Sequence, residues 1–441
     1  MFSYYLRLAM SSLRRTPVLS SLMVLALGLG IGAFMTTFTV YYLMSGDPIP
    51  HKSDVLYAVQ LDNWDPNNPP TESAKDVQPQ LTYLDGTNLM NADTPATLQV
   101  HMYATHAVVV PESGEPPFDE QIRATYQTIF EMFDVPFLYG QPWESSDDRD
   151  HASVAVIGRE LNERLFNGEN SVGRSIQLDD KFLKITGVID DWQPMPRFYH
   201  ADSSYRAFED AEQIFIPMTL AVEEPMLPSG NTNCWKAFDE SLPLVEAFMQ
   251  SECVWTQFWA QLDTPEKAAA YKDYLDNYVR DQKEIGRFER PLNTFISDVN
   301  EWMEVNEVVR DDNRVLVRLS FLFLLVCVLN TVGLLLAKFL GKSGEVALRR
   351  AMGASKGAVF SQNLVEVGMI GVLGGLAGTG LAWLGLQAVK AMYQGYQHLV
   401  HLDPVMLITA VGLATLAAIV AGIYPVWRVA QLAPAGLLKT Q

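Results

Sequence analysis

The sequence predicts an α+β membrane protein in which four transmembrane helices carry one large outer domain between the first and the second helix. Four apolar runs predict the helices, since a bilayer core takes roughly 20 helical residues to cross; they cover residues 18–44, 315–340, 359–389 and 403–424. The charges predict the outer domain. Residues 46–318 hold 21 Lys and Arg against 48 Asp and Glu, whereas the rest holds 11 against 3. Such a division indicates that parts of the chain face different compartments.

The first 17 residues combine Arg7, Arg14 and Arg15 with apolar side chains and hold no acid, which favours an amphipathic helix at the cytosolic membrane surface. A secretory signal peptide is the alternative for the run at 18–44. Its apolar region would be about 7–15 residues long and would end in a small-residue cleavage site. This run is longer and ends TVYYLMSGDP, so we expect an uncleaved anchor with its N-terminal side in the cytosol.

Residues 45–314 are too polar to span a membrane and numerous enough for a core of their own. Alternating apolar residues and turn signals predict several local elements. These are a strand at Leu98–Val110, a helix from Thr125 to Val135, a strand at Ser153–Ile157, a helix at Arg159–Phe166, a hairpin of Ser175–Leu178 with Lys181–Ile189, and a helix at Pro265–Arg280. We further expect one continuous helix from Glu301 to Leu340, which would make a stiff stalk into the second span.

Cys234 and Cys253 both lie in the outer domain, where an oxidising compartment permits a disulfide; two free buried thiols are the alternative. No metal site is expected. The histidines form no ligand pattern, and the acidic group at 147–150 lacks the spacing of a calcium loop.

The basic stretch 341–358 follows the second span, so the positive-inside rule places it in the cytosol. The third span, 359–389, then leads to a short outer loop at 390–402, and the fourth, 403–424, to a cytosolic tail at 425–441. Both termini are therefore expected inside. Close helix packing, or ordinary membrane-helix composition, explains the small and polar residues within the spans: Gly28, Gly32, Asn330, Gly371 and Gly375.

No catalytic motif is found. Gly341-Lys342-Ser343 has the ending of a phosphate-binding loop, but Leu336 occupies the position where that loop needs its first glycine. We therefore expect this chain to bind no nucleotide and no other cofactor. Nucleic-acid binding is excluded as well, since the outer domain has no basic face to neutralise phosphates.

The stretch Glu345–Lys356, EVALRRAMGASK, resembles the signature that follows the second span of MacB/FtsX-like ABC transporter permeases, the mechanotransmission class (type VII). Asn330 matches a residue common in that family's second span, and Tyr424-Pro425 with Pro434 resembles its ending. Within the outer domain the resemblance is to the MacB periplasmic core, through residues 130–140, 154–166, 172–173 and 185–188.

This resemblance implies a permease of the bacterial inner membrane that works with an ABC ATPase, a second permease (identical or different), and in some systems a periplasmic adaptor and an outer-membrane channel. The two permeases would pair through their first and second spans. MacB carries a fused ATPase before its first span. Here the first span begins near residue 18, so we expect ATP and Mg²⁺ to be held by a separate subunit.

The resemblance also implies that the cytosolic loop couples the permease to the ATPase, through Glu345, Arg349, Arg350, Gly353, Ala354 and Ser355. The alternative is a basic loop that only sets topology, with the glycine as a helix end. Three classes of function are open. They are export or extraction of an antibiotic, peptide or lipid-like substrate, FtsX-like control of a periplasmic cell-wall hydrolase, and ligand sensing. Sensing is the weakest of them, because a sensor needs a cytosolic output domain.

Overall fold

Each apolar run of the sequence forms a long helix in the structure, a computed structural model that describes residues 2–67, 77–200, 206–224, 226–309, 311–392 and 404–431. These helices are α2 (Pro17–Met44), α11 (Asp311–Gly341), α13 (Lys356–Met392) and α14 (Pro404–Ala430). Among the described residues, these four are long and apolar enough to cross a membrane. With α1 (Phe2–Arg15) and α12 (Ser343–Ala351) they form the helical unit, Met1–Ser45 with Val309–Gln441.

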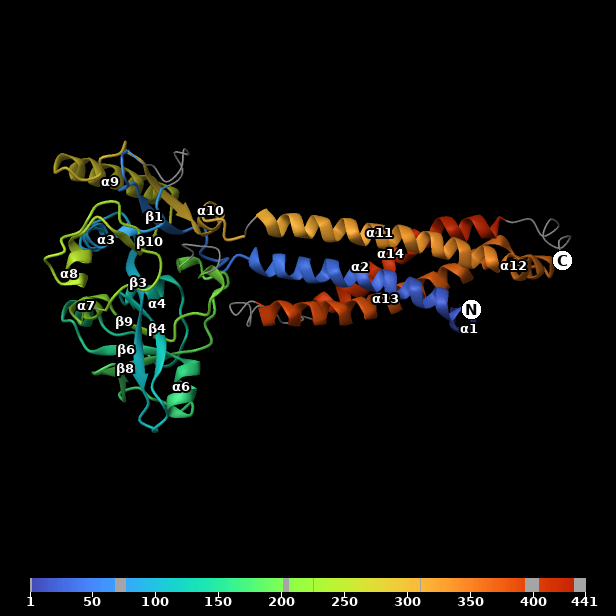
Figure 1. Ribbon diagram of the computed structural model, residues 1–441, viewed down its shortest axis with the longest axis horizontal. Coiled ribbons are helices and arrows are strands. Elements are labelled where there is room, and N and C mark those ends of the chain that lie inside the picture. Colours follow the sequence, from blue (N-terminus) through green and yellow to red (C-terminus); the bar gives the residue numbers. More distant parts are fainter. Residues whose placement is uncertain are drawn as a thin grey trace. The chain divides into compact units, whose positions relative to one another are not determined.

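The helical unit is a bundle in which α2 packs against α11 and α13, and α14 packs against α11 and α13 (Figure 1). Helix α2 begins with Pro17, whose fixed φ suits the first helical position, and its 28 residues rise about 42 Å. Large apolar side chains fill the space between the helices, among them Leu27, Leu335, Phe339 and Val426. The bundle is therefore held by packing along its whole length.

Helix α14 runs beyond Tyr424, where the sequence led us to end the fourth span. Pro425 lies inside the helix, although proline removes one backbone donor and usually kinks or ends a helix. Val426 and Val429 are fully buried in the next turn. Their burial against the bundle explains why the helix continues to Ala430. Asp403, Pro434 and most of the loop at 390–402 lie outside the described residues.

The continuous stalk expected from Glu301 to Leu340 is wrong. Helix α10 (Val299–Val305) ends in a Schellman motif: the N–H of Glu307 bonds to the carbonyl of Glu304, and that of Val308 to the carbonyl of Met303. Glu307 has a φ of 48°, the left-handed conformation that this motif requires. Val308 is fully buried, so tertiary packing favours the break, and a new helix, α11, begins at Asp311.

Eleven strands of the outer domain, Gly46–Val308, join in one mixed sheet of order β11-β1-β10-β3-β4-β9-β6-β8-β5, with β2 on β10 and β7 on β3 and β8. Pairing is parallel for β4 with β9 and for β6 with β8, and antiparallel elsewhere. The strands are β1 (Leu56–Leu61), β2 (Leu81–Thr82), β3 (Leu98–Val110), β4 (Phe118–Thr125), β5 (Phe137–Gly140), β6 (Val154–Gly158), β7 (Ser175–Leu178), β8 (Lys181–Ile189), β9 (Ile214–Pro217), β10 (Val254–Gln261) and β11 (Thr294–Asp298).

Strand β3 joins two parts of the outer domain because it is 13 residues long. Its first half pairs with β10, Leu98 opposite Gln261, and its second half pairs with β4, Tyr103 opposite Ala124. One core lies around β1, β10 and α9 (Pro265–Glu284), and the other around β4, β6, β8 and β9. The α+β class predicted from the sequence is confirmed.

Short helices cover the sheet: α3 (Tyr83–Met90), α4 (Thr128–Met132), α5 (Ser145–Arg149), α6 (Arg159–Phe166), α7 (Met218–Glu223) and α8 (Leu244–Gln250). The helix expected from Thr125 to Val135 is shorter than predicted. It ends after Met132 because Asp134 turns left-handed, with a φ of 49°, and Val135 bonds back to the carbonyl of Phe130.

Candidate functional site

The stretch that the sequence singled out forms α12, a short helix between α11 and α13. Its Val346 and Ala347 are buried in the core of the helical unit. Gly353 ends the helix with a φ of 101°, and the N–H groups of Gly353 and Ala354 bond to the carbonyls of Arg350 and Arg349. This is a Schellman motif, which favours glycine because other side chains strain at positive φ.

Helix α13 begins where this motif ends. Ser355 accepts a hydrogen bond on Oγ from the N–H of Ala358, at 3.1 Å, and so caps the first turn. Gly353, Ala354 and Ser355 therefore make a tight corner between α12 and α13. The corner explains the glycine and the serine as parts of a helix end; whether it also transmits motion stays a prediction.

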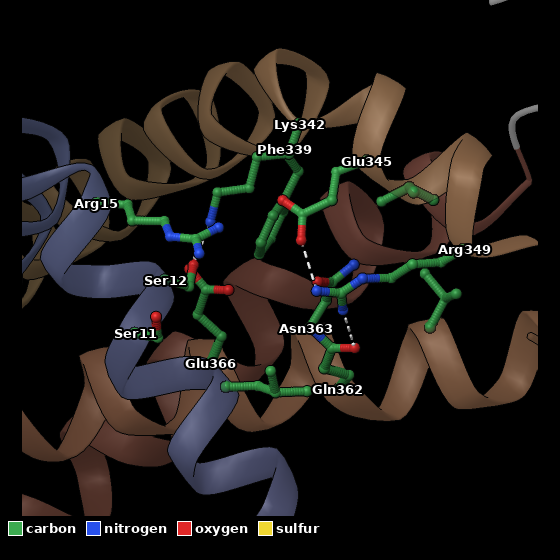
Figure 2. A pocket seen from close by; sticks show the side chains of 13 residues that line it. Ser11, Ser12, Arg15, Phe339, Lys342, Glu345, Arg349, Gln362, Asn363 and Glu366 are labelled. Atoms are coloured by element: carbon green, nitrogen blue, oxygen red, sulfur yellow. Dashed lines mark hydrogen bonds and ion pairs between the residues drawn. The ribbon is translucent and has the colours of Figure 1, made fainter. Parts of the chain in front are cut away.

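Arg349 ties α12 to α13. It donates one hydrogen bond to Gln362 Oε1, at 2.7 Å, and a second to Glu345 Oε1, at 2.5 Å, one turn earlier on its own helix. Two of the predicted coupling residues thus turn toward their own bundle (Figure 2). Arg350 is partly buried.

The opposite face of α12 carries the exposed side chains. Leu348 is 53% exposed and Met352 is 73% exposed, four residues apart, and Gly344 precedes them by one turn. Gly344, Leu348 and Met352 form an apolar stripe, to which we refer as the outward stripe of α12. Exposed apolar patches mark sites of contact with a protein or with a membrane.

A buried charge network lies beneath α12. Glu366 of α13 pairs with Lys338 of α11 at 2.7 Å and with Lys342 at 3.4 Å, and it accepts a hydrogen bond from Ser12 of α1. Lys338 also donates to Ser20 of α2, at 3.0 Å. The network joins α1, α2, α11 and α13. Since breaking a buried pair leaves an uncompensated charge, it holds these helices in one arrangement.

Two family models match this chain. One for the MacB-like periplasmic core domain matches residues 20–278, more than half of the chain. A second, the FtsX-like permease C-terminal, matches residues 318–434 and so includes α12, α13 and the charged residues of the network, Lys338, Lys342 and Glu366. The chain belongs to the MacB/FtsX-like family of ABC transporter permeases. The resemblance seen in the sequence is confirmed, and the protein is a multi-pass membrane protein with a periplasmic-type domain.

Individual relatives are distant. The macrolide export ATP-binding/permease protein MacB of Syntrophobacter fumaroxidans is 31% identical over 68 residues, which are 15% of this permease and only 10% of that protein. Among solved structures, the periplasmic region of MacB from Actinobacillus actinomycetemcomitans matches with 11% identity and a TM-score of 0.36, covering 59% of this chain and 95% of that one. The extracellular domain of the transporter YknZ from Gram-positive bacteria matches with 9% identity and a TM-score of 0.35, covering 55% of this chain and 100% of that one. The family assignment rests on the two family models.

Glycines let the helices of this permease approach closely. A Cβ at Gly32 of α2 would lie 2.7 Å from Leu381 Cβ of α13, and one at Gly28 would lie 3.2 Å from Ala377 Cβ. Another face of α13 meets α14, where a Cβ at Gly371 or Gly375 would come within 2.8 Å of an α14 atom. These four glycines therefore mark helix contacts within one chain.

Asn330 differs from these glycines. Its side chain is exposed on α11 beside Gly333, along a shallow groove between α2 and α11. Among the described residues, no other helix of the chain covers it. Within the described part of this chain, the structure therefore shows no packing role for Asn330.

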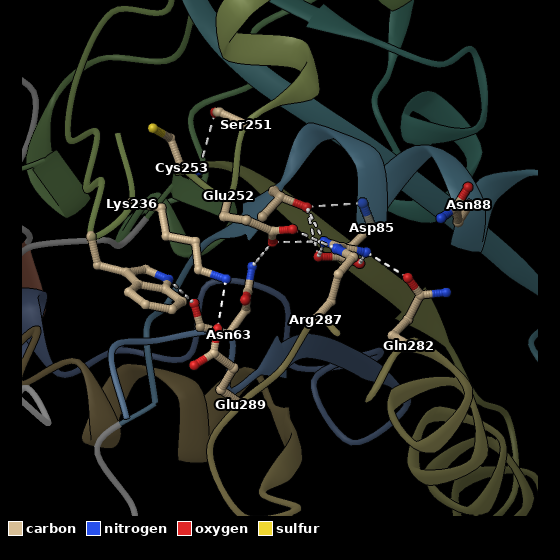
Figure 3. A network of polar contacts seen from close by, with 12 residues as sticks. Asn63, Asp85, Asn88, Lys236, Ser251, Glu252, Cys253, Gln282, Arg287 and Glu289 are labelled. Carbon is tan, nitrogen blue, oxygen red and sulfur yellow. Dashed lines mark hydrogen bonds and ion pairs between the residues drawn. The ribbon is translucent and has the colours of Figure 1, made fainter. Parts of the chain in front are cut away.

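Cys234 and Cys253 are joined by a disulfide, with an S–S distance of 2.00 Å. Glu252, beside Cys253, accepts hydrogen bonds from Arg287 and from Asn63, both at 2.6 Å, and Arg287 also binds Asp85 at 2.8 Å (Figure 3). Burial alone would raise the pKa of Glu252, but Arg287 holds it below its usual value. The disulfide and this network together fix the loop before β10, so the cysteine pair has a structural role.

A second buried network lies in the other core of the outer domain. Glu212 pairs with Arg123 and, at 3.1 Å, with Arg197, and it accepts a hydrogen bond from Tyr199. Burial would raise the pKa of Glu212, yet the two guanidinium groups hold it well below its usual value. Each of these buried ions has a partner of opposite charge, as buried ions need. Within the described ranges no group of His, Cys, Asp and Glu has the arrangement of a metal site.

Sequence reasoning missed Glu366 and the outward stripe of α12. Glu366 is the one acidic residue in the apolar run 359–389, and an ionisable residue in such a run is by default a site candidate with a partner nearby. That signal was present. The stripe had a signal too, since Leu348 and Met352 are one helical turn apart, but the sequence could not tell which face of the helix the bundle buries.

Proposed function

We propose that this ABC permease subunit couples ATP hydrolysis by a separate ATPase subunit to movement of its outer domain, for export or extraction of an antibiotic, peptide or lipid-like substrate at the bacterial inner membrane. The ATPase subunit supplies the bound ATP and Mg²⁺. The basic residues of α1 and α12 favour a cytosolic position for these two helices, with the outer domain on the periplasmic side.

The observation that carries this proposal is the outward stripe of α12. Its helix is held from below by Val346 and Ala347 and tied to α13 by Arg349, so a force applied to it passes into the bundle. Leu348 and Met352 are large, exposed and apolar, so a partner that covered them would remove apolar area from water. We assign the ATPase subunit as their occupant because the family is one of ABC permeases.

The test is purification of the tagged permease from membranes of its own host, followed by identification of the co-purifying ATPase and measurement of Mg²⁺-dependent ATP hydrolysis. The double variant Leu348→Glu with Met352→Glu places two charges on the stripe. It should lower that hydrolysis more than tenfold, since each apolar side chain that the ATPase covers is worth about 1–2 kcal/mol of binding. The control is Leu244→Glu, which changes a leucine of the outer domain that is 48% exposed. Unchanged hydrolysis in the stripe variant would sink the docking role.

Arg349→Glu with Arg350→Glu addresses the coupling residues that the sequence suggested. Because Arg349 ties α12 to α13, we expect the ATPase to remain bound while stimulation of its activity is lost. A co-purifying periplasmic adaptor, with or without an outer-membrane channel, supports export, whereas a cell-wall hydrolase in its place would assign the FtsX-like regulatory role.

We further propose that a second permease covers the α2–α11 face, where Asn330 is exposed. A polar amide within a membrane span gains from a hydrogen bond to another helix. Cysteine crosslinking tests this with Asn330→Cys in a Cys327→Ala background. A crosslinked species of twice the chain mass indicates a homodimer, and one with a different permease indicates a heterodimer. No crosslink would refute the assigned face.

A further inference from the structure

A polar cavity of about 90 Å³ lies between α1, α12 and α13, at the end of α11 (Figure 2). Its lining includes Ser11, Ser12 and Arg15 of α1, Lys342, and Asn363 and Glu366 of α13. A cavity needs roughly 10–15 Å³ of such volume to hold one water, so this one has room for several waters or for one phosphate group. The network already described forms one wall of this cavity and does not fill it.

Positive charge exceeds negative charge at this wall. Lys338 and Lys342 share one carboxylate, Glu366. Arg15 lines the same cavity, and no ion-pair or hydrogen-bond partner of its guanidinium is found in the described part of the chain. The other carboxylate of the lining, Glu345, is bound by Arg349 at 2.5 Å. Within the described part of the chain, the cavity thus lacks a counter-ion for Arg15, and Lys342 shares its single carboxylate with Lys338.

Asn363 provides an independent indication of a ligand. Its side chain is only 7% exposed and lines the cavity, yet its amide nitrogen donates no hydrogen bond. Buried polar groups are nearly always hydrogen-bonded, because burial without a partner costs the lost bond to water. A buried donor in a cavity that Arg15 and Lys342 also line favours an acceptor that carries negative charge.

We propose that this cavity binds a phosphate ester, with Arg15 and Lys342 as its charge partners and Asn363 as a hydrogen-bond donor, and that its source is the headgroup of an anionic phospholipid. Phe339 and Lys342 place the cavity at the end of a membrane-spanning helix, the level at which headgroups lie. Basic pockets between membrane helices on the cytosolic side bind such headgroups. A bound lipid would clamp α1 onto α12 and α13.

The experiment uses the delipidated full-length permease without any ATPase, so its outcome is independent of the proposed function. Native mass spectrometry measures retention of phosphatidylglycerol, and of phosphatidylcholine as the neutral comparison, with inorganic phosphate as competitor. Arg15→Gln should weaken phosphatidylglycerol binding about tenfold, the loss of one charge-assisted contact. Asn363→Asp should weaken it at least as much, because it places a carboxylate at the donor position.

Arg14→Gln is the matched control: it removes the same charge from the same helix, and Arg14 does not line the cavity. It should bind phosphatidylglycerol as the unaltered chain does. Equal loss in Arg14→Gln and Arg15→Gln, or no loss in Arg15→Gln, overturns the proposal. Displacement of the lipid by millimolar inorganic phosphate supports recognition of the phosphate group. It overturns the assignment of a lipid as its source and favours a soluble ester. Arg15 is exposed, so its variant tests the cavity even if Asn363→Asp fails to fold.

Discussion

Replacement of His101 should make the outer domain markedly less sensitive to acid. His101 lies on β3 with no exposed surface, between the rings of Tyr83 and Phe258, and neither of its ring nitrogens has a hydrogen-bond partner. Burial lowers the pKa of this imidazole to about 3 from its usual 6.5. The folded state therefore holds the neutral ring, whereas the unfolded chain takes up a proton below pH 6.5.

Acid consequently favours unfolding, and stability falls as the pH drops from about 6.5 toward about 3. From these two pKa values, going from neutral pH to pH 5 costs about 2 kcal/mol of unfolding free energy. His200 adds a term of the same sign, because burial and the neighbouring Arg123 also lower its pKa to about 3. In His101→Leu the roughly 2 kcal/mol that His101 contributes should disappear, which is about half of the combined loss from the two histidines. At neutral pH the variant should be as stable or slightly more stable, since no hydrogen bond is removed.

The assay is urea unfolding of the full chain in detergent, followed by fluorescence of the buried Trp255 and Trp259 at pH 7.5 and pH 5. His106→Leu is the control, because it removes a histidine of the same strand that lies at the surface, bonded to Asp119. The reasoning fails if His101→Leu loses as much unfolding free energy between the two pH values as the unaltered chain.

Three further predictions concern helix contacts and helix ends. Lys338→Met should lower the free energy of unfolding by about 3–5 kcal/mol, because Glu366 then keeps only the longer of its two ion pairs, the one with Lys342; Lys338→Met with Glu366→Leu should recover most of this loss in a double-mutant cycle. Gly32→Ala should destabilise by about 1–3 kcal/mol through overpacking, whereas Gly380→Ala, where a Cβ meets nothing within 4 Å, should raise the melting temperature. Glu307→Gly should stabilise by about 1 kcal/mol in chemical unfolding, since it relieves a left-handed residue; unchanged stability would contradict the Schellman assignment.

Local patterns predicted the elements whose stability is mostly local. Strand β3, the hairpin of β7 and β8, and helix α6 have the predicted bounds, because the alternation and the turn signals that predicted them are read within a few residues. The stalk was predicted wrongly for the opposite reason. Nothing in the composition of Glu301–Arg314 ends a helix, and the break goes with the burial of Val308, which the local sequence does not reveal.

The candidate site shows the same division. The motif at Glu345–Lys356 was enough to identify the loop, but only the bundle shows that Arg349 turns inward to Gln362 and that Leu348 faces outward. Likewise, the isolated charge of Glu366 was visible in the sequence, while its partner on α11 was not.

By itself, the sequence determined the four apolar runs, the charge asymmetry between the compartments, the α+β class and the family. Each of these depends on residue type and short spacing along the chain. Tertiary structure alone decided which glycines touch which helix, that Lys338 and Lys342 share Glu366, and that α12 exposes an apolar stripe above a polar cavity. Those features join residues of different helices, some of them hundreds of positions apart, and their energies come from packing and burial, which no local pattern encodes.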